Sequence, residues 1–120
     1  MFPSYVLSNL FVKNSLKNTP SGFEMKLKNI IDSGTVVGLG PLTVDETSFS
    51  TDKITLKVKE RSARADKISN SAPFPVYILS EVEISVEGSP LTPGNHKLGF
   101  LIHTLEAGRL SFTIQEPLTD

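Results

Sequence analysis

The chain has 120 residues, with 12 Lys and Arg against 13 Asp and Glu, for a formal net charge of −1. That length predicts one domain over residues 1–120, which would bury about two-thirds of the surface that its unfolded form exposes. The absence of cysteine excludes disulfides, thiolate metal sites and cysteine nucleophiles. The balanced charge argues against nucleic acid as a partner, because a basic surface is missing.

Nothing in the sequence indicates a targeting or membrane segment. Residues 1–5 lack the basic region and the long apolar region of a signal peptide. The apolar stretches elsewhere are only a few residues long, too short to span a bilayer. The composition therefore predicts a cytoplasmic protein with no membrane partner.

The N-terminal part of the chain contains short apolar runs and turn residues. Residues 10–12 and 36–37 are compatible with strands, and residues 19–22 form a predicted turn because Pro presets φ and Gly accepts positive φ. The Gly-Leu-Gly-Pro sequence at 38–41 superficially resembles a phosphate-binding loop. It lacks a third Gly, a Lys and a following helix, so it is interpreted as a turn or bulge between strands.

Period-two alternation of apolar and polar residues dominates the rest of the chain. It predicts strands around 23–28, 53–58, 81–87 and 96–102, and a final strand around 110–114 that forms a hairpin with the preceding one across residues 106–109. The predicted core consists of Phe23, Met25, Leu27, Ile54, Leu56, Val82, Ile84, Phe100, Ile102, Leu110, Phe112 and Ile114.

A single segment has a helical pattern. Ala63, Ala65 and Ile68 lie near one side of a helix over residues 60–68, which predicts one or two turns before the break at 69–73. Seven to nine short strands, spaced about ten residues apart, predict an all-β fold: an antiparallel two-sheet sandwich, immunoglobulin-like in outline.

The candidate chemical groups each have a simpler structural explanation. His96 and His103 are an odd seven residues apart, so on one strand they face opposite sides, with His96 near an edge and His103 toward solvent. The row of Glu81, Glu83 and Glu87 could hold catalytic carboxylates, but cross-strand pairing with the lysines suffices to explain it. That lysine row comprises Lys53, Lys57 and Lys59, and no G-x-S-x-G motif occurs. We therefore predict no catalytic, cofactor-binding or metal-binding residue in this chain.

Four aromatic residues fall outside the alternating runs: Phe2, Tyr5, Phe74 and Tyr77. Phe74 lies between two prolines, so it either plugs the end of the sandwich or projects toward a partner. The four are the predicted partner interface.

Two stretches together resemble a known family. Residues 16–27 (LKNTPSGFEMKL) have the form of a strand, a turn and a strand, and residues 91–98 (LTPGNHKL) have a Pro-Gly-x-His turn that leads into a strand. Over residues 5–116, this pattern is similar to the small β subunit of bacterial C-glycoside deglycosidases.

The resemblance implies an accessory role. In that family a β-sandwich subunit packs against a larger TIM-barrel α subunit, which holds the catalytic base and a divalent metal. The complex cleaves the carbon–carbon bond between a sugar and an aromatic aglycone. No catalytic residue of the family maps onto this sequence, so the expected function is that of a noncatalytic subunit.

Two alternatives remain open from the residues alone. One is a stand-alone β-sandwich module that binds a sugar or a protein through loops at one end. The other is a small enzyme that combines His96 or His103 with carboxylates brought together by the fold.

Overall fold

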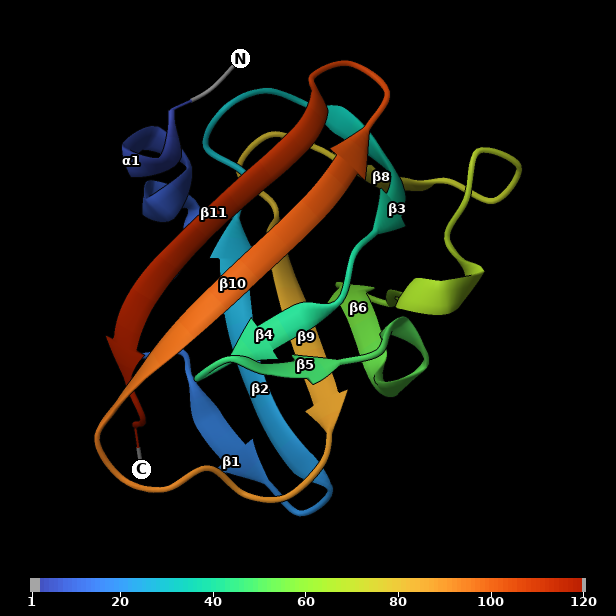
Figure 1. The fold of residues 1–120 in the computed structure, drawn as a ribbon. Helices are drawn as coiled ribbons and strands as arrows, with labels where there is room; N and C mark the ends of the chain where they lie inside the picture. The colour runs from blue at the N-terminus through green and yellow to red at the C-terminus, as the bar shows by residue number, and fades with distance from the viewer. Residues whose placement is uncertain (1–2, 120) are drawn as a thin grey trace.

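Two antiparallel sheets lie face to face in the computed structural model, which describes residues 3–119 (Figure 1). The first sheet has the order β1-β2-β9-β6-β7, with strands at Lys17–Thr19, Gly22–Lys28, Glu81–Glu87, Ile54–Val58 and Arg61–Arg64. The second sheet has the order β5-β4-β10-β3-β8, and β11 pairs with β10 on the other side. Its strands are Thr47–Phe49, Leu42–Val44, Asn95–Thr104, Gly34–Leu39, Phe74–Val76 and Gly108–Pro117. The all-β sandwich is thus confirmed.

The predicted alternation explains how the first sheet faces the core. Met25 lies opposite Ile84, and Ile84 lies opposite Leu56, so the central three strands present a continuous apolar face. On the outer face, Glu83 lies between Lys26 and Lys57. The predicted pairing of the glutamate and lysine rows is therefore present.

The rest of the lysine row follows that pairing only in part. Lys53 approaches Glu87 at 4.0 Å, whereas Lys59 lies in a turn with a φ of 55° and outside the row.

β10 is the central strand of the second sheet. It pairs with β11 along ten residues on one side, and with β4 and then β3 on the other. Phe100 stacks on Phe112 at 4.9 Å between ring centroids, which fixes the hairpin against the core. Of the twelve predicted core residues, all but Ile102 and Ile114 are buried, and these two are partly buried.

The N-terminal segment differs from the predicted strand at 10–12. It forms a short helix, α1 (Ser4–Leu7), followed by a 3₁₀ turn, η1 (Ser8–Leu10), and only Phe11 makes a single bridge to Leu27 of β2. Leu10 and Phe11 are both buried, which consecutive strand residues on a half-buried sheet cannot achieve because they face opposite sides. The segment covers the edge of β2 that β1 leaves open.

The predicted helix over 60–68 is also wrong. Residues Arg61–Arg64 form β7, which pairs along β6 and places Ala63 opposite Leu56, and a 3₁₀ turn (η3, Ala65–Lys67) follows. The spacing of Ala63 and Ala65 fits an extended strand as well as a helix. Pairing with the free edge of β6 makes this segment a strand rather than a helix. A third 3₁₀ turn, η2 (Thr51–Lys53), precedes β6.

The eleven strands found over residues 3–119 exceed the predicted seven to nine. The additional ones include β5 and β8, which have three residues each and are too short to show an alternating pattern. Within the same residues, no helix is long and apolar enough to cross a membrane. The cytoplasmic location stays a prediction from composition.

Gly22, at the start of β2, is required by a close backbone approach. A Cβ at this position would lie 1.9 Å from the Val86 carbonyl oxygen, a contact that only a backbone shift could relieve. We expect Gly22→Ala to lower the free energy of unfolding by at least about 2 kcal/mol.

The matched control is Gly38→Ala in β3, where the nearest atom would be the His103 ring at 3.5 Å. Urea denaturation of both variants measures the difference. Equal loss of stability in the two variants would contradict the steric explanation.

Candidate functional site

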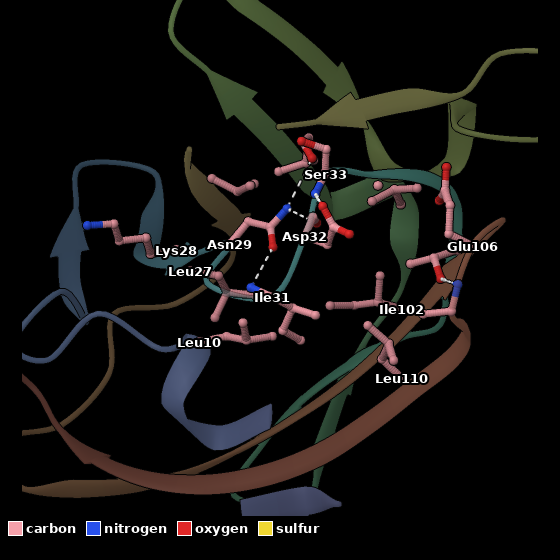
Figure 2. Close-up of a pocket in the computed structure, with 16 residues that line it drawn as sticks. Leu10, Leu27, Lys28, Asn29, Ile31, Asp32, Ser33, Ile102, Glu106 and Leu110 are labelled. Atoms are coloured by element: carbon pink, nitrogen blue, oxygen red, sulfur yellow. Dashed lines mark hydrogen bonds between the residues drawn. The ribbon is translucent and has the colours of Figure 1, made fainter. Parts of the chain in front are cut away.

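A cavity of about 330 Å³ opens at one end of the sandwich, between the two sheets (Figure 2). Its lower wall is formed by Leu10, Leu27, Ile31, Ile102 and Leu110, whose side chains converge in Figure 2. The rest of the lining comes from the end of β2 and the loop after it, from β3, β8 and β9, and from the β10–β11 loop. These remaining residues are Lys28, Asn29, Asp32, Ser33, Gly34, Val36, Val76, Val82, Thr104, Glu106 and Ala107. We refer to this space as the end cavity.

The cavity exists because of the side chains that the sequence places there. Facing sheets are about 10 Å apart, and large side chains are needed to fill that space. Aromatic rings fill it elsewhere: Phe23 contacts Phe49 edge to face at 5.3 Å, and Phe100 stacks on Phe112. The residues that line the end cavity include no aromatic, and three of them are valines.

Asn29 fixes the loop on one side of the opening. Its side-chain amide donates to the carbonyls of Asp32 at 2.7 Å and Val76 at 3.1 Å, and its oxygen accepts from the Ile31 amide at 3.2 Å. Its backbone carbonyl accepts from Leu79 at 2.6 Å. The Asn29 side chain therefore links the loop after β2 to the end of β8, and its backbone carbonyl links it to the loop after β8.

Glu106 fixes the other side of the opening. Its carboxylate accepts from the backbone amide of Thr35 at 2.8 Å and from the Thr35 hydroxyl at 2.9 Å. These hydrogen bonds, the backbone one foremost, lower the pKa of Glu106, so the carboxylate is ionised at neutral pH. A group in this state cannot serve as a general acid. Both sides of the opening are thus held in place before any ligand arrives.

The β8–β9 loop beside the opening exposes apolar side chains. Tyr77, Ile78 and Leu79 are exposed, as is the neighbouring Ile30. Leu79 adopts a φ of 70°, which is uncommon for a residue with a branched side chain. The amide of Ile78 donates to the Ser33 hydroxyl at 2.9 Å, so this loop is also tied to the loop after β2.

Of the four aromatic residues predicted as a partner interface, the three that the structure describes do not form one surface. Phe2 lies outside the described residues. Tyr5 in α1 and Tyr77 are exposed, whereas Phe74 is 4% exposed and has the Arg61 guanidinium 5.0 Å above its ring. Of the two predicted alternatives for Phe74, its burial therefore agrees with packing inside the sandwich and not with projection toward a partner. α1 packs beside β11, and β8 forms the opposite edge of the same sheet (Figure 1).

His96 lies at the start of β10, at the far end from the end cavity, and its side chain is buried. The predicted position near an edge is wrong, because β10 is paired on both sides. Its Nδ1 lies 2.5 Å from the Asp45 carboxylate and its Nε2 lies 2.6 Å from the Thr92 carbonyl oxygen. Because both partners are acceptors, the two hydrogen bonds together favour the imidazolium form, in which both ring nitrogens donate, and they raise the pKa of His96. Asp45 also accepts from the Lys97 amide at 2.8 Å. This arrangement joins the β4–β5 turn to the start of β10.

His103 faces the other side of β10, as the odd spacing predicts, and packs against Gly38. Over residues 3–119, no group of three His, Asp or Glu side chains is placed to hold a metal ion. The Gly-Leu-Gly-Pro sequence carries the end of β3 into β4, and a register shift between His103 and Thr104 accompanies it. The interpretation as a strand connection is confirmed.

That the loop at residues 29–33 lines a cavity was not predicted from the sequence. Its signal is the Ile30–Ile31 pair, which breaks the alternation at the end of β2 and lies between Asn29 and Asp32. Asn and Asp favour local side-chain hydrogen bonds to the backbone, so this pattern indicates a structured turn with one apolar residue inward and one outward.

The pH dependence of stability tests the His96 site. The Thr92 carbonyl and the Asp45 carboxylate raise the pKa of His96 above its usual 6.5, and the Lys97 amide and the His96 ring lower the pKa of Asp45 below its usual 3.8. The His96 contribution is therefore complete below pH 6.5 and is lost as the pH rises through the folded-state value. The Asp45 contribution is present above pH 3.8 and is lost as the pH falls further.

We expect the Tm to fall as the pH rises above 6.5, and this slope to be much smaller in His96→Gln. Thermal unfolding followed by circular dichroism measures both. His103→Gln is the matched control and should keep the wild-type slope. A wild-type slope that persists in His96→Gln would contradict the assignment of the imidazolium.

Comparison with known proteins corrects the family assigned from the sequence. The family model described as hydroxymethylglutaryl-CoA reductase, N-terminal domain, matches residues 6–119. No curated protein matches the chain. The resemblance to a C-glycoside deglycosidase β subunit is therefore wrong, and with it the expected sugar-active complex and its TIM-barrel partner. The Pro-Gly-x-His pattern that suggested it is explained by the burial of His96 against Thr92 and Asp45, a local structural role. Since the match spans nearly the whole chain, the protein belongs to the hydroxymethylglutaryl-CoA reductase N-terminal domain family.

Proposed function

We propose that this chain is a domain that binds a small apolar molecule, and that the end cavity receives the apolar part of that molecule. The observation that carries the proposal is an apolar space of about 330 Å³ whose two sides are fixed by hydrogen bonds of Asn29 and Glu106. Small-molecule sites are concave, mostly apolar and largely preformed, with a few polar groups at fixed positions. The sugar-binding alternative loses support because the five side chains that form the lower wall of the cavity are all apolar.

The volume limits the size of the ligand. Ligand pockets range from roughly 300 to 1,000 Å³, so this one lies at the small end. An engineered apolar cavity of about 150 Å³ holds benzene. A group of two fused rings, or a branched aliphatic group of similar size, therefore suits the end cavity.

The charges at the opening select the polar end of the ligand. Asp32 and Glu106 place two carboxylates at the opening, whereas the Lys28 side chain extends away from the apolar wall (Figure 2). An anionic group there would be repelled by both carboxylates and left without a cation. A neutral or cationic hydrogen-bond donor is the complementary partner.

The proposal assigns binding, and no step of a reaction, to this domain. The family name refers to a reductase, and hydrogen bonds lower the pKa of Glu106 and keep it ionised, so this carboxylate is not a general acid near neutral pH. Within a reductase of this family, the domain would hold a ligand or a part of one, and it would need no cofactor of its own.

Three probes with one ring system and different charges test the proposal. We expect 2-naphthylmethylamine and 2-naphthol to bind and 2-naphthoate to bind at least about tenfold more weakly, because of the two carboxylates. Chemical-shift changes of the Ile31, Val36, Ile102 and Leu110 methyl groups during titration locate the site and give the dissociation constants. In Glu106→Gln, which keeps the acceptor for Thr35, the preference for the cationic probe should decrease.

Ala107→Trp provides the blocking variant, because Ala107 is exposed and lines the opening. Leu105→Trp is its matched control: Leu105 lies two residues away in the same hairpin loop, is 62% exposed and does not line the cavity. Binding should be lost in the first variant and kept in the second. Equal binding in both, or the absence of methyl shifts with all three probes, would refute the proposed function.

A further inference from the structure

The β9–β10 loop, residues 88–94, has few contacts that hold its middle in place. Backbone hydrogen bonds join its first residue to Ser21 and its last residue to Leu118. Between them, Leu91 packs partly buried against the core, and all the other residues are exposed. The exposed Asn18 side chain accepts from the Leu91 amide at 2.8 Å and donates to the Leu91 carbonyl at 3.0 Å, where water competes for the same groups.

The one buried attachment in the middle of this loop is the hydrogen bond from His96. Nε2 of the ring lies 2.6 Å from the Thr92 carbonyl oxygen, and the His96 side chain is 5% exposed. A hydrogen bond from an ionised donor is roughly twice as strong as one between neutral groups. The protonation state of the ring therefore determines how firmly the middle of the loop is held.

The charged residues around the His96 ring are mostly acidic. They are Asp45 and Glu46 in the β4–β5 turn, Glu116 in β11 and Lys97 in β10 itself. Glu116 lies opposite His96 in the β10–β11 register and shares its inner face, whereas Lys97 is exposed on the outer face. The loop contributes no charge, because its sequence is Gly-Ser-Pro-Leu-Thr-Pro-Gly. The hydrogen bonds to Thr92 and Asp45 raise the pKa of His96 above its usual 6.5, so the titration midpoint of the ring lies above that pH.

Loss of the proton leaves the neutral ring with one N–H for two acceptors. The Asp45 carboxylate is the stronger acceptor because it is charged, so the remaining proton stays on Nδ1. Nε2 then turns its lone pair toward the Thr92 carbonyl oxygen, and two acceptors at 2.6 Å repel each other. The β4–β5 turn keeps its place, because Asp45 also accepts from the Lys97 amide and donates its own amide to the Lys97 carbonyl, each at 2.8 Å.

We propose that His96 is a pH switch for the β9–β10 loop: loss of its ring proton releases the middle of the loop from the sandwich, while the β4–β5 turn stays paired with β10. Rotation of the Thr92 carbonyl does not relieve the repulsion, since Pro93 restricts the residue before it to extended conformations. Movement of the loop does relieve it, and that movement exposes Nε2 and the Leu91 side chain. The switch lies at the opposite end of the sandwich from the end cavity and does not rest on the proposed function.

NMR spectroscopy of the whole chain from about pH 5 to about pH 10, across the usual range of histidine titration, tests the switch. The ¹⁵N shifts of the ring give its protonation state and tautomer. Relaxation of the Cα–Hα groups of Leu91 and Thr92, whose hydrogens do not exchange with water, reports the motion of the loop. We expect the Nδ1–H tautomer above the midpoint, and order parameters that fall from about 0.85 to below about 0.6 with the same midpoint. The Cα–Hα group of Thr47, next to the β4–β5 turn, should not change.

Asp45→Asn is the variant that removes the switch and keeps the hydrogen bonds. The Asn oxygen accepts from the Lys97 amide, and its Nδ2 donates to Nδ1 of a neutral ring whose Nε2–H donates to Thr92. Asp45 has a φ of 50°, which Asn adopts readily, so the turn is preserved. The loop should stay ordered at every pH in this variant. His103→Gln is the matched control and should release the loop as the wild type does.

An ordered loop in the wild-type protein after the ring has lost its proton, or a neutral ring with its proton on Nε2, would overturn the proposal. So would a ring that stays protonated up to the pH at which the chain unfolds, because the loop would never be released. The wild-type titration decides these outcomes without any variant. Equal release in the wild type and in Asp45→Asn would contradict the role assigned to the carboxylate.

Discussion

The double-sided pairing of β10 is the constraint on which the rest of the structure depends. β11 covers one side of this strand along its whole length, while β4 and β3 share the other side in sequence. A register shift between His103 and Thr104 lies within the β10–β3 pairing, where Thr104 pairs with Val36 rather than with Val37. The start of β10 carries the His96 imidazolium, its middle carries Phe100 in the core, and its end forms a wall of the end cavity.

Different interactions stabilise the two ends of the sandwich. At the start of β10, a buried cation held by the Asp45 carboxylate and the Thr92 carbonyl joins three segments. A buried ion of this kind is stabilising only while all its partners are in place. At the other end, hydrogen bonds of Asn29 and Glu106 fix the loops in place, and aliphatic side chains without aromatic rings leave space between the sheets. The end at His96 is therefore filled by a buried ion pair, whereas the opposite end contains a cavity with an apolar wall.

The parts of the fold that depend on local alternation could be predicted, and the parts that depend on distant partners could not. The strands containing Met25, Leu56 and Ile84 follow from period two, because each buries one face. The burial of His96 depends on Asp45, which is 51 residues away, and nothing near His96 in the sequence indicates it. The end cavity likewise depends on side chains from η1, from six strands and from the loops after β2 and β10, so no single stretch of the sequence predicts it.

The β10–β11 hairpin must be long because it contributes to both ends of the sandwich. The register pairs His96 with Glu116 and Ile102 with Leu110, so one hairpin reaches from the buried ion to the cavity wall. At about 3.4 Å per residue, the six residues from His96 to Ile102 span roughly 20 Å, and a shorter hairpin would lose one end or the other. A long β11 is thus a consequence of building both sites on one pair of strands. The other edge strands have three or four residues, whereas β11 has ten, and α1 packs beside it.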